Sequence, residues 1–325
     1  MDHGAHHATS GSSVALFILL VLLPAFTLGA YLYFALRERA EGRWSSWRIV
    51  SFTAGIGMLI AAMSSPVSDW AHHDLRGHMV QHLLLGMFAP LGLVLGSPGT
   101  LLLRNVPVGV AKGIVGFLGT LPVRFLSNPV TAALLDIGGM YVLYLTPLYA
   151  LSLNDPAVHV LLHVHFVISG SLFTWAIAGP DPAPHRPGML VRLVVLFLAT
   201  AAHANLGKIM YGYGYPRGIV ADPIEIQSAA QWMYYGGDLA ELLLTAAFFA
   251  LWFRSGRVPD PLAPTRIFRR DPLNPPKPAE PETLFERLRD VGIPYKSTKS
   301  ELVSIRVGIR QTRKISTRLR TRRYD

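Results

Sequence analysis

The sequence predicts an all-α, polytopic membrane protein with seven transmembrane helices, and three observations lead to this prediction. The chain has 325 residues, of which 51% are hydrophobic and only 15% charged, a balance too apolar for an ordinary soluble domain. Its apolar residues gather in runs of about 18–25 residues, each long enough to cross a hydrocarbon core of roughly 30 Å as a helix. Lys and Arg are concentrated in alternate connecting segments, as is typical of multi-spanning proteins.

Seven apolar runs divide the chain in order. They cover residues 14–36, 49–67, 79–103, 130–151, 158–178, 189–206 and 229–253. The third run is interrupted by Pro90 and by Gly96-Ser97-Pro98-Gly99, and we interpret the second interruption as a turn. Residues 106–121, between the third and fourth runs, are expected to lie along the membrane surface.

The charge distribution predicts the orientation. Basic residues collect in the segments after the first, third and fifth runs: Arg37, Arg39, Arg43, Arg48, Arg104, Lys112, Arg124, Arg186 and Arg192. The opposite segments hold few, so the positive-inside rule places the N-terminus outside and the C-terminus in the cytoplasm. We expect three parts: a histidine-containing outer tail at 1–13, a membrane domain at 14–253 and a cytoplasmic tail at 254–325.

The C-terminal tail carries the whole formal charge of +10. Residues 1–253 hold twelve Lys/Arg and twelve Asp/Glu, whereas the tail holds eighteen and eight. Eight prolines between residues 259 and 281 predict an extended linker. We interpret the tail as attracted to anionic lipid headgroups, with an RNA or protein contact as the alternative. Because no nucleic-acid fold motif accompanies the basic run, nucleic-acid binding is not predicted.

Eleven of the twelve histidines fall on the predicted outer side. His78 and His82 are spaced i,i+4 at the outer end of the third run, so they share a helix face, and His159 and His163 repeat this spacing in the fifth. His203 lies at a similar depth in the sixth run. Imidazole is the commonest metal ligand in proteins. Two such pairs on neighbouring helices can supply four nitrogens to one centre, which predicts a metal site.

Other histidines are further candidates. His72 and His73 precede the first pair and are possible additional ligands, whereas His165 points roughly opposite to the second pair. For these three, an interfacial histidine hydrogen-bonded to neighbouring backbone is the competing interpretation. Intramembrane ionisable residues otherwise favour a functional role.

The ligand types favour copper. The chain contains no cysteine, which excludes thiolate sites, and imidazoles with nearby thioethers suit copper. Met79 lies between the paired histidines and is the candidate thioether, although methionine is equally typical of helix packing. Zinc remains open, as does a haem iron held between two spans.

Acidic residues near the histidines predict supporting roles. Asp69 precedes the first histidine cluster and is a candidate to orient an imidazole, whereas Asp74 is expected to cap a helix. Asp238 and Glu241 share one face of the seventh run. We interpret them as partners of metal ligands or as proton-handling groups. Asp136, in the fourth run, is a further buried carboxylate of this kind.

Several segments resemble one family. Ser65-Pro66 with Asp69, then His78-Met79-Val80-Gln81-His82, Ala89-Pro90 and Leu95-Gly96-Ser97-Pro98 are similar to the signature of CtaG, the multi-spanning caa-type cytochrome c oxidase assembly factor. The resemblance covers about residues 14–253. His78 and His82 match the paired histidines of that family, and His159 and His163 match it loosely.

The resemblance implies a non-enzymatic role in the bacterial inner (plasma) membrane. Such a factor would bind copper at the outer face and aid its delivery to the catalytic subunit of a haem–copper oxidase. Two alternatives remain open at this point: a membrane redox protein with histidine-ligated haem, and a structural scaffold of the oxidase without metal.

Overall fold

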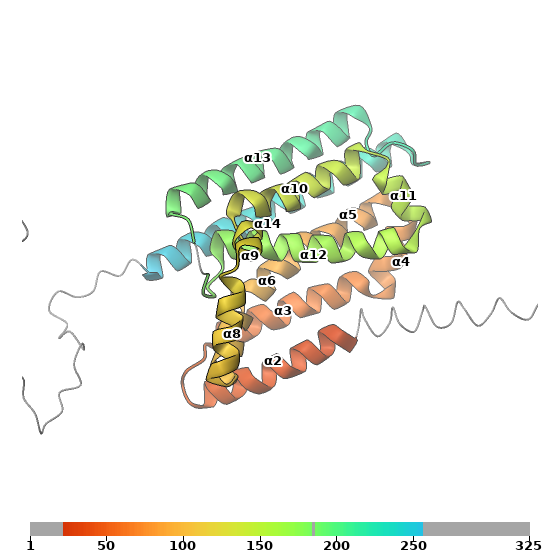
Figure 1. The fold of residues 1–325 in the computed structure, drawn as a ribbon. Coiled ribbons are helices and arrows are strands. Elements are labelled where there is room, and N and C mark those ends of the chain that lie inside the picture. The colour runs from red at the N-terminus through yellow and green to blue at the C-terminus, as the bar shows by residue number, and fades with distance from the viewer. Residues whose placement is uncertain (1–21, 184–185, 256–325) are drawn as a thin grey trace, which may run out of the picture. The chain divides into compact units, whose positions relative to one another are not determined.

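The described part of the chain is a bundle of helices. The computed structural model describes residues 22–183 and 186–255, and within these ranges the regular elements are all helical (Figure 1). The elements are α2 (Leu23–Ala40), α3 (Ser46–Met63), α4 (Ser65–His73), α5 (Leu75–Leu83), the π-helix η2 (Leu84–Phe88), α6 (Ala89–Leu95), α7 (Pro98–Asn105), α8 (Val108–Leu118), α9 (Leu121–Leu126), α10 (Pro129–Leu145), α11 (Leu148–Asn154), α12 (Pro156–Ala178), α13 (Met189–Tyr213) and α14 (Pro223–Ser255).

The helix lengths confirm a multi-spanning membrane protein. Five stretches are long and apolar enough to cross a bilayer: α3, the continuous rod Leu75–Leu95, α12, α13 and α14. The pair α10 and α11 makes a sixth if the two are counted as one bent span. The predicted first span, 14–36, is described only from residue 22 onward, as part of α2. The seventh span and the orientation therefore stay predictions, as does the tail after residue 255.

Two predicted spans were expected to be continuous helices, but each is interrupted near a proline. The second was expected to reach residue 67, but α3 ends at Met63 and α4 begins at Ser65 with Pro66 in its first turn. The fourth was expected to be one helix. Instead α10 ends before Thr146, which is extended because Pro147 follows it, and α11 continues at 78° to α10.

The third predicted span was wrong in a different way. Pro90 does not break it: the helix runs from Leu75 to Leu95 through the π-helical turn η2, which ends directly before Ala89. A π-helical turn shifts the hydrogen-bond register and so accommodates the N–H that proline lacks. The rod ends instead at the predicted turn, where Ser97 adopts a left-handed conformation, so the expected end at residue 103 was also wrong.

The rod α5–η2–α6 packs against α3, α12 and α14, and backbone approaches closely at small residues. A Cβ added at Gly170 of α12 would lie 2.0 Å from the carbonyl oxygen of Gly86 in η2. A Cβ at Gly92 of α6 would lie 2.8 Å from the Cα of Gly55 in α3. Ser51 of α3 also donates a hydrogen bond of 2.8 Å to the Gly92 carbonyl. Such small-residue crossings bring membrane helices into contact without large side chains between them.

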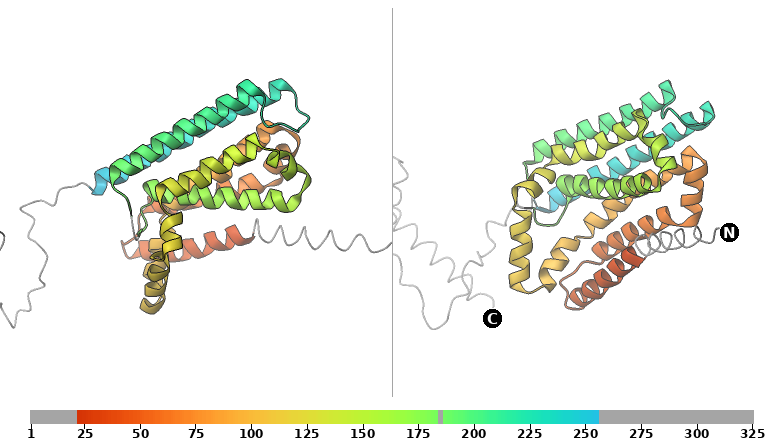
Figure 2. Two further views of the ribbon diagram at one scale, coloured as in Figure 1. Left: turned by 45° about the horizontal axis from the view of Figure 1, so that its top comes forward. Right: turned by 45° about the vertical axis from the view of Figure 1, so that its right-hand side comes forward.

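The short helices α7, α8 and α9 lie at the end where α2 meets α3 (Figure 1). Figures 1 and 2 show α8 running across the direction of the long helices. None of its side chains is buried in the described structure, and Val108 and Phe117 are among its exposed apolar residues. The expectation that residues 106–121 lie along the membrane surface stays a prediction.

Candidate metal centre

Both predicted histidine pairs line one cavity. His78 and His82 reach it from α5, and His159 and His163 reach it from α12. We call this small space, of about 10 Å³, the histidine cavity. Leu85, Leu143, Ser152, Leu162 and Phe166 complete its lining. The sequence alone left open whether the two pairs converge, and the packing of α12 against η2 brings them together.

The first pair is held by the start of α5. Asp74 caps this helix: its carboxylate accepts a hydrogen bond of 2.7 Å from the backbone N–H of Arg76. A carboxylate oxygen of Glu225, on α14, accepts the backbone N–H of Leu75 at 2.7 Å. His78 therefore lies on a helical turn that is fixed both locally and from α14. The predicted capping role of Asp74 is confirmed.

The cap also has an electrostatic consequence. The Arg76 guanidinium forms an ion pair with Asp74 and donates hydrogen bonds to it, which hold the pKa of that carboxyl below its ordinary value. Asp74 lies just before the first residue of the Leu75–Leu95 span. Its charge is therefore present at neutral pH and supports the first turn of α5.

His78 and His82 are buried without hydrogen-bond partners. Their side chains are 8% and 4% exposed, and neither ring nitrogen of either residue is hydrogen-bonded. Tyr144 stands edge-on to both rings, and its hydroxyl also lacks a partner. Buried polar atoms are nearly always paired in proteins because leaving them unpaired costs free energy. The two imidazoles are therefore free to bind a ligand within an apolar surrounding.

The second pair connects the histidine cavity to a larger opening. His159 and His163 also line a cleft of about 580 Å³, together with His72 of α4 and Met63 of α3. The ring centroids of His72 and His159 are 5.1 Å apart, and those of His159 and His163 are 4.3 Å apart. Imidazoles thus follow one another from exposed His72 to the buried pair on α5.

His203 is buried close enough to His82 to interact with it electrostatically, and it also faces a carboxylate of α14. It is 0% exposed, and both of its ring nitrogens lack hydrogen-bond partners. Its Nδ1 lies 3.8 Å from a carboxylate oxygen of Glu241, close enough for an electrostatic contact but not a hydrogen bond. Gly237 makes room for the ring, since a Cβ there would lie 1.8 Å from the His203 Cε1. Glu241 thus lies next to an imidazole, and its role as the partner of a metal ligand stays a prediction.

Other sequence candidates lie apart from the histidine cavity. His73 is exposed, and its Nδ1 is 2.7 Å from the carbonyl oxygen of Asp69. The Asp69 carboxylate accepts a hydrogen bond from Ser65 at 2.5 Å, so this residue contacts His73 through its backbone rather than its carboxylate. Met79 is buried in the hydrophobic core. Asp238 is partly buried and lines neither the cavity nor the cleft.

His165 contacts backbone rather than the histidine cavity, as in the interpretation of an interfacial histidine hydrogen-bonded to backbone. Its Nε2 is 3.1 Å from the carbonyl oxygen of Leu135 on α10, with the ring lying over Gly139. It points away from His159 and His163, as the spacing predicted. His3, His6, His7 and His185 lie outside the described residues.

The sequence reasoning missed the tyrosines around the cavity. Tyr149 of α11 stands edge-on to His78, with ring centroids 4.7 Å apart, and it is buried because α11 turns inward after Pro147. The signal for this bend was present in Thr146-Pro147, since a residue before proline avoids the helical conformation. Tyr144 gave no such signal, because its burial depends on which helices surround α10.

The side chains as placed do not enclose an ion. Among residues 22–183 and 186–255, no three His, Asp or Glu side chains are arranged as a ready metal-binding group. The arrangement presents a pair of unpartnered imidazoles on α5 facing a second pair on α12.

A comparison with protein families confirms the expected family. Residues 29–255 match the family described as cytochrome c oxidase caa3 assembly factor, which covers nearly all of the described helices. The chain is also similar to uncharacterized proteins of Mycobacterium bovis and Mycobacterium tuberculosis, each 34% identical over 181 residues. These matches cover 54% of this chain and 27% of each relative, so the chain spans only about a quarter of their length.

A Mycobacterium leprae relative, also uncharacterized, is 34% identical over 177 residues, which is 52% of this chain and 27% of the relative. No solved structure matches the chain.

Proposed function

The chain belongs to the cytochrome c oxidase caa3 assembly factor family, and we propose that it serves oxidase assembly by binding copper in the histidine cavity and passing it on. The observation that carries the proposal is the convergence of His78, His82, His159 and His163 on one cavity with unpartnered nitrogens on α5. In this proposal copper is the cargo. The recipient is the catalytic subunit of a haem–copper oxidase, and the protein itself catalyses no reaction.

The donor set supports copper over harder cations. Neutral imidazole nitrogens suit copper, and the thioether of Met63 lines the cleft that leads to the cavity. Carboxylates, which Mg²⁺ and Ca²⁺ prefer, do not line either space. A cavity of about 10 Å³ also has room for an ion or a water molecule but not for a haem macrocycle.

The order of the histidines suggests a route. Copper would first meet exposed His72, then His159 and His163, and finally the buried pair His78 and His82. Each step exchanges one imidazole for another, so the ion is never left without ligands in an apolar surrounding. With seven spans and the N-terminus outside, this route would begin at the outer face of the bacterial inner membrane.

Metal analysis of the purified full chain tests the proposal. We expect stoichiometric copper after loading and dialysis, and its loss in the double variant His78→Ala with His82→Ala. The tail histidines are removed from all proteins (His3→Ala, His6→Ala and His7→Ala) so that they do not contribute. His73→Ala is the matched control, because His73 is nearby but lines neither space.

Two outcomes would overturn the proposal. One is the absence of bound copper in the protein that retains His78 and His82. The other is equal copper in the double variant, which would place the metal elsewhere. If the double variant still supports oxidase activity in a deletion strain, the protein acts as a scaffold without metal.

A further inference from the structure

A second large concave surface lies away from the histidines. A groove of about 850 Å³ runs between α3 and α14 and has α6 as its floor. We call it the arginine groove, after the four arginines that line it. Its remaining lining is mostly apolar and includes Ala54, Met58, Leu91, Leu243, Ala247 and Ala250.

The four arginines gather at one end of the groove. They are Arg43, which follows α2, Arg48 near the start of α3, Arg104 in α7 and Arg254 at the end of α14. No Asp or Glu lines the groove. It therefore combines a cationic mouth with apolar walls.

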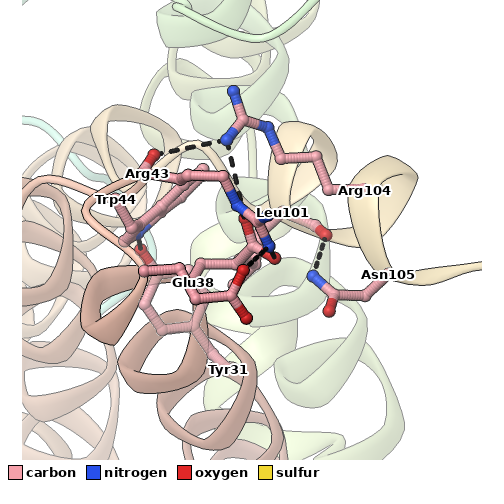
Figure 3. A network of polar contacts seen from close by, with 8 residues as sticks. Tyr31, Glu38, Arg43, Trp44, Leu101, Arg104 and Asn105 are labelled. Carbon is pink, nitrogen blue, oxygen red and sulfur yellow. Dashed lines mark hydrogen bonds and ion pairs between the residues drawn. The ribbon is translucent and has the colours of Figure 1, made fainter.

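A buried network fixes part of this mouth. Glu38 is 5% exposed and accepts two hydrogen bonds from Arg43, at 2.8 and 3.1 Å (Figure 3). Arg104 lies 3.6 Å from the same carboxylate and donates a hydrogen bond of 3.2 Å to the Arg43 carbonyl. Both arginines are thus held in place before any ligand arrives, which lowers the entropy that binding must remove.

The other two arginines carry the charge that remains. Glu38 and Glu41 form ion pairs with Arg43, whereas Arg48 stacks on the Trp44 ring at 4.6 Å from its centroid. Arg254 is exposed at the end of α14. Four guanidinium groups thus face two carboxylates, and the mouth has a net positive charge. Guanidinium groups bind phosphate oxygens in a bidentate manner, so this mouth suits a phosphate ester.

The length of the apolar walls matches a lipid chain. Met58 lies ten residues beyond Arg48 on α3, and Leu243 lies eleven residues before Arg254 on α14. At 1.5 Å per residue, both walls extend about 15 Å from the arginines. This is about half of a hydrocarbon core of roughly 30 Å, the depth of one leaflet. The walls carry small side chains at Ala54, Ala247 and Ala250, which leaves room for an acyl chain to lie against them.

We propose that the arginine groove binds one anionic phospholipid, with its phosphate among Arg48, Arg104 and Arg254 and an acyl chain along α3 and α14. A transmembrane helix of another protein also fits walls of small residues, but it would place apolar or uncharged groups against the cationic mouth. The charge of the mouth favours the lipid. None of the histidines of the proposed copper route lines this site.

Native mass spectrometry of the purified full chain tests this inference. After delipidation, the protein is mixed with phosphatidylglycerol or phosphatidylethanolamine of the same acyl composition. We expect one phosphatidylglycerol molecule to stay bound at activation energies that strip phosphatidylethanolamine. The double variant Arg48→Ala with Arg254→Ala should lose this preference and weaken retention at least tenfold.

A matched control separates the groove from general charge. Lys112→Ala with Arg124→Ala removes the same charge from α8 and α9, outside the groove, and should retain the lipid like the wild type. Ala250→Trp should weaken retention while keeping every arginine, because it fills the apolar wall. The inference would be overturned if the wild type retained both lipids equally, or if the Lys112 and Arg124 control lost phosphatidylglycerol as readily as the Arg48 and Arg254 variant. A copurifying protein that occupies the groove would also overturn it.

Discussion

The arginine end and the histidine end of the bundle both bury polar groups, but they differ in how those groups are satisfied. At the arginine end, buried Glu38 accepts two hydrogen bonds from Arg43 and lies beside Arg104. At the histidine end, His78 and His82 keep all their ring nitrogens unpartnered. A paired network stabilises the fold, whereas unpaired buried groups weaken it unless a ligand binds. This contrast is the one expected if the histidine end binds copper, as we propose.

The largest effect expected from this contrast is on ligand-linked stability. Copper should raise the thermal midpoint of the wild type, because a ligand that binds only the folded state stabilises it. His78→Ala with His82→Ala should abolish this rise without lowering the midpoint of the metal-free protein. Thermal unfolding in detergent, with and without copper, measures both. A metal-free double variant that is strongly destabilised would show that the imidazoles serve packing instead.

The next effect concerns the contact that brings the two histidine pairs together. Gly170→Ala should strongly lower the thermal midpoint, because its Cβ would lie 2.0 Å from the Gly86 carbonyl oxygen and must displace α12 from η2. Gly138→Ala on α10 meets no atom within 4 Å and should be neutral or slightly stabilising. Equal midpoints for the two variants would contradict the packing described here.

A smaller effect is expected at the arginine end. Glu38→Gln should lower the free energy of unfolding, because it removes the charge that accepts two hydrogen bonds from Arg43. Glu41→Gln is the control: its carboxylate is 47% exposed and its ion pair with Arg43 should contribute less than about 1 kcal/mol. Neither variant should change copper binding. If both variants behave alike, the buried network does not stabilise this end.

The smallest effect is the pH dependence of the α5 cap. Because Arg76 lowers the pKa of Asp74 in the folded protein, the cap stabilises the fold above the unfolded pKa of about 4. This contribution is lost as the pH falls through the lower, folded pKa. The difference in thermal midpoint between the wild type and Asp74→Asn should therefore shrink below about pH 4. A difference that stays constant down to pH 2 would contradict this assignment.

Local features of the site could be predicted from the sequence. The spacing of His78 with His82, and of His159 with His163, sets which side chains share a helix face, and helix geometry alone determines it. Asp74 was expected to cap a helix for the same local reason, and it does. The apolar runs likewise predicted a multi-spanning bundle, although not where each helix ends.

Features that depend on contacts distant in the sequence could not be predicted in this way. The convergence of the two histidine pairs depends on the close approach of Gly170 to Gly86. The hydrophobic pattern of the sequence does not indicate that two helices cross at these glycines. The burial of Tyr149 depends on the 78° bend at Pro147. His203 was expected near the paired histidines, and it does interact electrostatically with His82, whereas its contact with Glu241 of α14 could not be read from the sequence.

X-ray absorption of the copper-loaded full chain tests the central claim most directly. The tail variant lacking His3, His6 and His7 is compared with the same chain also carrying His78→Ala and His82→Ala. We predict imidazole nitrogens around copper in the first protein and no ordered copper in the second. A shell without imidazole in the first protein, or an imidazole shell unchanged in the second, would contradict a copper site in the histidine cavity.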